Sequence, residues 1–294
     1  MDTLAIAFED YSTEVATEAV AGQLRVIAEE AKRLHSVDVY RQCLSFVDYT
    51  SLNATDTPAH GRSLAEKVNS FSKRYPSLPN VAAICVYPSL VEPVRKTLKA
   101  EGVRIAAVAA GFPAAQTFLE VKLKECRLAI EAGASEVDVV ISLGYLLGGE
   151  APTAFGELAR IKSEAGGGGC HLKVILETGL LPSLPLVRKA SLGSLMAGAD
   201  FIKTSTGKVE PAATPEAALV MCQAIKDYHA QTGKKAGFKA AGGIATTADA
   251  VMYYAIVKHV LGEAWLTPAL FRIGASRLAN KLLSDITGKE EKHF

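Results

Sequence analysis

Short apolar, β-branched runs recur along the chain, and each is followed by a longer segment with apolar positions at helical spacing. The runs predict eight strands, at Leu44–Val47, Val81–Val86, Ile105–Ala109, Val137–Ile141, Leu172–Leu176, Phe201–Thr204, Gly237–Ala240 and Phe271–Gly274. The intervening segments predict helices near Ser63–Arg74, Leu90–Ala100, Gln116–Ala132, Ala154–Lys162, Leu184–Ala197, Pro215–Ala230, Thr247–Val260 and Ser276–Ser284. Strands that are apolar throughout are typical of a parallel sheet covered by helices. Eight such units with no midpoint reversal predict an α/β fold, the (β/α)8 TIM barrel.

Three segments fall outside this regular pattern. Residues 1–40 are expected to form an N-terminal helical extension, in which Val20–Leu34 has apolar positions at helical spacing and could close the barrel bottom or contact a partner. The barrel itself is predicted over residues 41–287. The charged tail Gly288–Phe294 is expected to fray, and Gly166–Gly169 to form a flexible loop before the fifth strand.

Composition narrows the class of partner. Hydrophobic residues make up 49% of the 294 positions, which is enough for a large core. The 32 Lys and Arg residues nearly cancel the 31 Asp and Glu residues, so we expect a small-molecule partner rather than nucleic acid or a membrane surface. The five cysteines are scattered without a CxxC pair, which favours reduced thiols over disulfides or a zinc site. With no basic, apolar leader and no long apolar stretch, the expected location is cytoplasmic.

Three charged residues within the apolar runs stand out as candidates for chemistry. Asp138 lies among valines in the fourth strand, Lys203 follows two bulky apolar residues in the sixth, and Lys239 has the equivalent place in the seventh. Adjacent strands are about 4.8 Å apart, so two inward lysines would disfavour each other's protonation. An amine that loses its proton in this way is the nucleophile of Schiff-base chemistry. The alternatives are a purely structural carboxylate and lysines that reach solvent from the strand ends.

Glycines follow the last three predicted strands. The segments are Thr206-Gly207-Lys208, Gly242-Gly243 and Gly274-Ala275-Ser276, the last of which opens a helix. Glycine lets backbone N–H groups approach an anion, and a helix N-terminus adds partial positive charge. These loops are the usual phosphate site of such barrels, although glycines can also simply make tight turns.

These segments resemble the deoxyribose-phosphate aldolase family, and the resemblance runs in order from about Asp48 to Leu283. The matching stretches are 83–88 (AICVYP), 137–140 (VDVV), 172–179 (LKVILETG), 199–208 (ADFIKTSTGK), 237–239 (GFK) and 272–276 (RIGAS). The stretch over 199–208 is highly specific.

The resemblance implies a class I aldolase on a (β/α)8 barrel that needs no metal or other cofactor. Its reaction is reversible cleavage of 2-deoxy-D-ribose 5-phosphate to D-glyceraldehyde 3-phosphate and acetaldehyde, in deoxyribonucleoside catabolism. Carried over, Lys203 resembles the Schiff-base lysine, Lys239 the lysine that lowers its pKa, and Asp138 the acid/base that works through a water. The substrate-binding positions are Asp48, Thr206, Gly207, Lys208, Gly242, Gly243, Gly274 and Ser276. Relatives suggest a homodimer or homotetramer.

Several positions depart from the family pattern. Ala240 replaces a proline, Ala245 a cation, and Arg277 a small polar residue beside the phosphate loop. Gly111-Phe112-Pro113 stands where Asn-Phe-Pro is usual, and the tail ends in 292–294 (KHF) where many members have a tyrosine. The alternative hypothesis is therefore an aldolase fold retained as a scaffold that binds another protein, with weak or no lyase activity.

Overall fold

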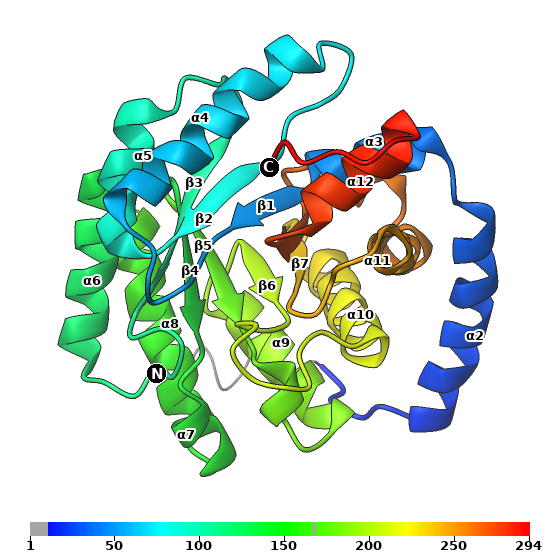
Figure 1. The fold of residues 1–294 in the computed structure, drawn as a ribbon. Coiled ribbons are helices and arrows are strands. Elements are labelled where there is room, and N and C mark those ends of the chain that lie inside the picture. The colour runs from blue at the N-terminus through cyan, green and yellow to red at the C-terminus, as the bar shows by residue number, and fades with distance from the viewer. Residues whose placement is uncertain (1–10, 167–168) are drawn as a thin grey trace.

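Eight parallel strands close into a barrel in the computed structural model, which describes residues 11–166 and 169–294 (Figure 1). The strands are β1 (Val47–Thr50), β2 (Ala83–Val86), β3 (Arg104–Ala109), β4 (Glu136–Val140), β5 (His171–Ile175), β6 (Phe201–Lys203), β7 (Gly237–Ala241) and β8 (Phe271–Ala275). The ring is closed by parallel pairing of β1 with β8, in which Asp48 lies opposite Gly274. The predicted TIM-barrel fold is confirmed.

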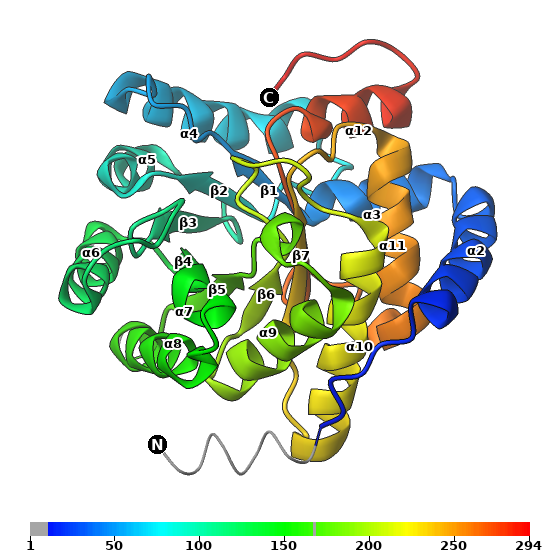
Figure 2. The same cartoon turned by 90° about the horizontal axis from the view of Figure 1, so that it is seen from below.

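Helices surround the strands on all sides, as the view from below shows (Figure 2). The α-helices are α2 (Thr17–Arg33), α3 (Val37–Ser45), α4 (Pro58–Arg74), α5 (Val91–Thr97), α6 (Leu119–Ala132), α7 (Leu143–Leu147), α8 (Ala151–Gly166), α9 (Leu184–Met196), α10 (Pro215–Thr232), α11 (Thr247–Leu261) and α12 (Leu278–Thr287). Short 3-10 turns cover Pro88–Leu90, Thr178–Leu180 and Glu263–Trp265. None of the described helices is both long and apolar enough to cross a lipid bilayer.

The first strand begins later than its apolar run predicts. Leu44 and Ser45 end helix α3, and β1 starts at Val47. Ser36 caps α3 by accepting a hydrogen bond from the Val39 amide. The apolar residues of this segment therefore follow helical spacing, and the strand prediction over Leu44–Val47 is wrong by three residues. The glycine run at 166–169 lies partly outside the described residues.

Helix α2 covers the outside of the barrel rather than its bottom. Its buried residues are Val20, Ile27 and Ala31, which lie on one face. This face packs against α10 and α11, and both views place α2 at the periphery beside them (Figures 1 and 2). Closure of the barrel bottom by this segment is therefore wrong.

The C-terminal tail is packed against the barrel wall, so the expected fraying is wrong. Phe294 is only 8% exposed and lies between Tyr49 and Phe71, with ring centroids 5.3 and 5.0 Å away. The imidazole of His293 lies 2.8 Å from the Lys67 carbonyl oxygen, and the Tyr75 hydroxyl donates a hydrogen bond to buried Glu291 at 2.5 Å. The charged residues of this segment predict exposure to solvent. Packing of the Phe294 ring against buried aromatic side chains nevertheless holds the segment on the protein.

We predict that Phe294→Ala lowers the free energy of unfolding by about 3 kcal/mol, because it removes a buried ring from an aromatic cluster. Chemical denaturation followed by fluorescence measures the change. Phe118→Ala is the matched control: Phe118 is 78% exposed, and its loss should change stability by less than about 0.5 kcal/mol. Equal, small effects of the two substitutions would show that the tail contributes nothing to the fold.

Candidate active site

The interior of the barrel is divided into an apolar and a charged side. Apolar residues from β2, β3 and the loop after β1 form one cluster, made of Leu52, Ala83, Cys85, Ala106 and Val108. The opposite side carries seven buried ionisable side chains, which are Asp48, Glu136, Asp138, Lys173, Lys203, Lys239 and Arg272. Charges buried beside an apolar wall are only weakly screened, so each needs a partner within the cluster.

Asp138 lies at the centre of this charged cluster. Its Oδ2 accepts hydrogen bonds from Lys203 Nζ at 2.8 Å and from Lys239 Nζ at 2.7 Å. Its Oδ1 accepts a third from Lys173 Nζ at 3.2 Å. Burial alone raises the pKa of the Asp138 carboxyl, but the three lysines outweigh it and hold the pKa well below its usual range. Asp138 is therefore an ionised carboxylate that links β4 to β5, β6 and β7.

A second set of ion pairs lies around it. Asp48 Oδ2 is 2.5 Å from Lys239 Nζ, and Asp48 Oδ1 accepts from Arg272 at 2.6 Å. Arg272 also donates to Glu136 at 2.8 Å, and Lys173 donates to the same carboxylate. Removing one member of such a network leaves another charge buried without a partner, which is strongly destabilising. The cluster is therefore rigid and sensitive to substitution.

The charges in this cluster balance only if one base is neutral. The carboxylates are Asp48, Glu136 and Asp138, and the four bases are Lys173, Lys203, Lys239 and Arg272. Burial opposes the charge on Lys173, Lys239 and Arg272, but their carboxylate neighbours outweigh it and raise all three pKa values. Arg104, the first residue of β3, also lies 3.6 Å from Glu136, but its side chain is 45% exposed and solvent screens its charge. Lys203 is the fourth buried base.

Lys203 is the one lysine of this cluster whose pKa is lowered. Burial is the largest cause, the Asp138 carboxylate opposes it, and the charge of Lys239 lowers the pKa further. Cys85 faces the same space as a neutral thiol, because burial raises its pKa. A buried amine with a lowered pKa can attack a carbonyl carbon as a free base.

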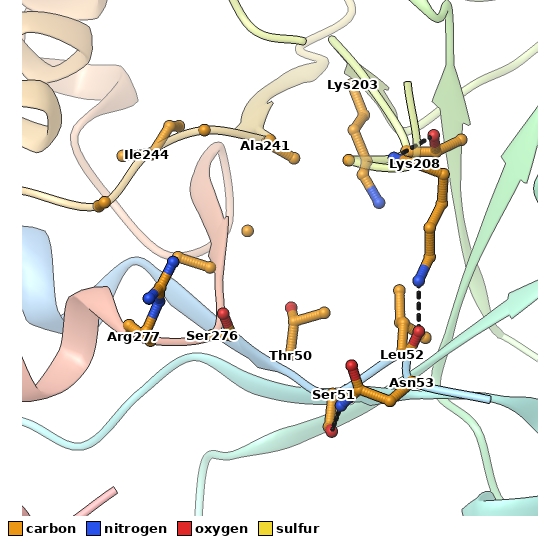
Figure 3. Close-up of a pocket in the computed structure, with 17 residues that line it drawn as sticks. Thr50, Ser51, Leu52, Asn53, Lys203, Lys208, Ala241, Ile244, Ser276 and Arg277 are labelled. Carbon is orange, nitrogen blue, oxygen red and sulfur yellow. Dashed lines mark hydrogen bonds between the residues drawn. The ribbon is translucent and has the colours of Figure 1, made fainter. Parts of the chain in front are cut away.

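Above the charged cluster, the amine of Lys203 opens into a pocket of about 330 Å³ at the carboxyl ends of the strands. Figure 3 shows Lys203 pointing into this space, with Thr50, Ser51 and Ser276 around it. The pocket is lined by residues from the loops after β1, β6, β7 and β8, which are Thr50–Asn53, Thr206–Lys208, Ala241–Ala245 and Gly274–Arg277. This volume suits a small metabolite.

The glycines of the pocket permit close packing that a side chain would prevent. A Cβ on Gly242 would lie 2.5 Å from the Ala212 Cβ and 3.3 Å from the Gly207 Cα. Gly242 and Gly243 both have positive φ, at 90° and 77°. A Cβ on Gly274 would lie 3.0 Å from the Lys239 Cε, so Gly274 also makes room for the charged cluster below. These glycines expose backbone to the pocket and bring β6, β7 and β8 together.

Four hydrogen bonds hold the loop after β6 in place. Glu177, buried and in the left-handed region at φ 51°, accepts from the Thr206 hydroxyl at 2.5 Å and from its amide at 3.0 Å. Thr206 in turn accepts from the Lys208 amide at 3.0 Å. The Lys208 ammonium donates to the Leu52 carbonyl across the pocket (Figure 3). The loop is therefore fixed at both ends before any ligand binds.

The structure brings all of the sequence-predicted site residues together. Lys203, Thr206, Gly207, Lys208, Gly242, Gly243, Gly274 and Ser276 line the pocket, and Asp48, Asp138 and Lys239 lie buried beneath it. Sequence reasoning missed Glu136, Lys173 and Arg272 in the cluster. Each is a charge inside an otherwise apolar strand, which is the same signal that identified Asp138. It also missed Glu177, since its left-handed backbone is not apparent from the sequence.

The fold and the site define a barrel enzyme in which a buried lysine with a lowered pKa opens into a small, glycine-lined pocket. Among residues 11–166 and 169–294, no group of three or more His, Cys, Asp or Glu side chains is placed to hold a metal ion. The DeoC/LacD family aldolase model matches residues 44–263. The chain belongs to this aldolase family.

Relatives of known name agree with this assignment. The chain is 44% identical over 260 residues to the deoxyribose-phosphate aldolases of Mus musculus and Homo sapiens, covering 83% of this chain and 78% of each relative. A tetrameric deoxyribose phosphate aldolase from Aeropyrum pernix has a similar structure, with a TM-score of 0.68 and 28% identity. That comparison covers 88% of this chain and 97% of the other.

We predict that Lys239→Met raises the pKa of Lys203, because the Lys203 ammonium loses a repelling neighbour and shares Asp138 with one fewer cation. The rate at which Lys203 forms an adduct with a short aldehyde under cyanoborohydride, followed over roughly pH 6 to 10, should shift toward higher pH.

Lys96→Met is the matched control for this shift, since Lys96 is a surface lysine on α5 that is 69% exposed. An unchanged pH profile in folded Lys239→Met protein would mean that Lys239 has no electrostatic effect on Lys203.

Proposed function

We propose that this protein is a class I aldolase that cleaves 2-deoxy-D-ribose 5-phosphate reversibly to D-glyceraldehyde 3-phosphate and acetaldehyde through a Schiff base on Lys203. The observation that carries the proposal is the placement of the Lys203 amine, which has a lowered pKa and opens into the pocket. Membership of the DeoC/LacD family and 44% identity to two named deoxyribose-phosphate aldolases support the choice of substrate.

The first step is attack of the neutral Lys203 amine on C1 of the open-chain sugar. The carbinolamine that forms loses water and becomes a protonated imine, which places a positive charge beside Asp138. Asp138 Oδ2, 2.8 Å from the Lys203 nitrogen, is ionised and stabilises this charge. The Asp138 carboxylate, which partly opposes the lowering of the Lys203 pKa, thus also stabilises the protonated imine.

The second step breaks the bond between C2 and C3. The C3 hydroxyl loses its proton, C3 becomes the aldehyde carbon of glyceraldehyde 3-phosphate, and the electron pair of the broken bond forms an enamine with the imine carbon. We assign the proton transfers to Asp138 acting through a water molecule. Protonation of the enamine at C2 and hydrolysis then release acetaldehyde and return the free Lys203 amine.

The loops after β6, β7 and β8 are the proposed site for the substrate phosphate. Gly207, Gly242 and Gly243 have positive φ, so their backbone can approach an anion closely. Ser276 is exposed beside the start of α12, whose N-cap residue makes no side-chain cap. The amides of that first turn are therefore available to an anion. We place the sugar hydroxyls near Thr206 and Lys208, with Asp48 below them. For the assembly we propose a homodimer or homotetramer, in line with the tetrameric relative from Aeropyrum pernix.

We predict that acetaldehyde with borohydride adds a two-carbon adduct at Lys203, detected by peptide mass spectrometry. The wild-type protein should release acetaldehyde from 2-deoxyribose 5-phosphate, and Lys203→Ala should lower turnover by several orders of magnitude because the covalent intermediate is lost.

Lys96→Ala, a surface substitution, should change neither result. Adducts confined to surface lysines would refute the Schiff-base assignment. A folded wild-type protein whose Lys203 is trapped but which turns over no substrate would instead favour the scaffold alternative.

A further inference from the structure

Arg277 stands at the rim of the pocket with a free guanidinium group. It follows β8 and occupies the N-cap position of α12, and it lines the same pocket as Gly243 and Ser276. In Figure 3 it lies on the Ser276 side of the space, across from Lys203 and Lys208. A cation here faces the phosphate end of the pocket.

In the part of the chain that the structure describes, Arg277 has no acidic partner, whereas Arg127 and Arg188 each do. Arg127 donates to Glu164 at 2.5 Å and Arg188 to Asp227 at 2.6 Å. Within the described residues, the Arg277 guanidinium makes neither an ion pair nor a hydrogen bond. All of its donors are therefore available to an anion, and a planar guanidinium binds phosphate oxygens in pairs.

Other donors near the rim, the Ala245 and Thr246 amides and the Lys208 ammonium, are already hydrogen-bonded within the protein. At the start of α11, the Asp249 carboxylate accepts from the amides of Ala245 at 3.1 Å and Thr246 at 2.9 Å. These two amides are therefore not available to an anion. On the far side, the Lys208 ammonium is bound to the Leu52 carbonyl. The pocket's charged lining is completed by Lys203, which we assign to the carbonyl end of the substrate.

We propose that Arg277 is the side-chain cation that binds the substrate phosphate, and that it sets the preference of the enzyme for phosphorylated over unphosphorylated sugars. The inference rests on the proposed function for the identity of the substrate. The geometry of the rim supports it independently, because Arg277 is the unpaired cation next to the glycine loops and the α12 N-terminus. A cation at this end orients the sugar with its aldehyde toward Lys203.

The test compares kcat/KM for 2-deoxyribose 5-phosphate and 2-deoxyribose. Arg277→Ala should lower the ratio of the two values about tenfold, mostly through KM for the phosphorylated sugar, because one charged hydrogen-bonding group at a solvated rim is lost. Arg25→Ala, which removes an exposed arginine from distant α2, should leave the ratio unchanged.

A second variant separates phosphate binding from a structural effect at the helix start. Ala245 lines the same pocket from the neighbouring loop after β7, so Ala245→Arg in the Arg277→Ala background returns a cation to the rim. It should restore most of the lost preference. An unchanged ratio in Arg277→Ala, or an equal loss with both sugars that Ala245→Arg does not restore, would overturn the proposal.

Binding of inorganic phosphate, measured by calorimetry, distinguishes this inference from the function on which it rests. If the wild-type protein shows no turnover but Arg277→Ala still weakens phosphate binding about tenfold, the reaction assignment fails and the anion site stands. If turnover is intact and phosphate binding is unaffected by Arg277→Ala, the role of Arg277 is refuted and the reaction assignment stands.

Discussion

The balance of charge inside the barrel is the constraint on which the site depends. Asp48, Glu136 and Asp138 bring three negative charges into an interior with little water, and Lys173, Lys239 and Arg272 neutralise them. A fourth buried cation would leave a net charge there, which is expensive next to an apolar wall. The chain places its fourth base, Lys203, at the top of the cluster beside Asp138, where losing a proton restores neutrality and opening into the pocket exposes the amine to a ligand.

The surrounding fold makes this balance possible. The ladder of β6 and β7 places Lys203 opposite Lys239, and that of β4 and β5 places Asp138 opposite Lys173, so the register of four strands assembles the cluster. Gly274 leaves space for the Lys239 side chain, and Gly242 lets the β6 and β7 loops meet above it. The charged layer and the glycine-lined layer are thus stacked along the barrel axis. The charged layer sets the pKa of Lys203, and the glycine-lined layer shapes the pocket.

Most of the architecture follows from local pattern, whereas the network depends on distant contacts. Eight apolar runs with helices between them were sufficient to predict the barrel, and interruptions by Asp138, Lys203 and Lys239 were sufficient to locate the buried charged cluster. Lys173 and Arg272 carried the same signal, but their ion pairs join strands far apart in sequence. The wrong predictions for the C-terminal tail and for the first strand have a similar origin.

The sequence features of the tail and of the first apolar run were each outweighed by packing. The charged tail is held by contacts of Phe294 with Tyr49 and Phe71, which no local pattern shows. The apolar residues before β1 belong to α3, because Ser36 starts a helix whose buried face continues to Leu44.

The most direct measurement of the central claim is an NMR titration of the lysine side chains in protein labelled with 13C at lysine Cε, with Lys203 assigned from the spectrum of Lys203→Arg. The charge balance predicts that Lys203 titrates below the ordinary lysine pKa of about 10.4, while Lys173 and Lys239 stay protonated throughout the range in which the fold is stable. A Lys203 signal that remains protonated to the same pH as those of its two neighbours would contradict the account.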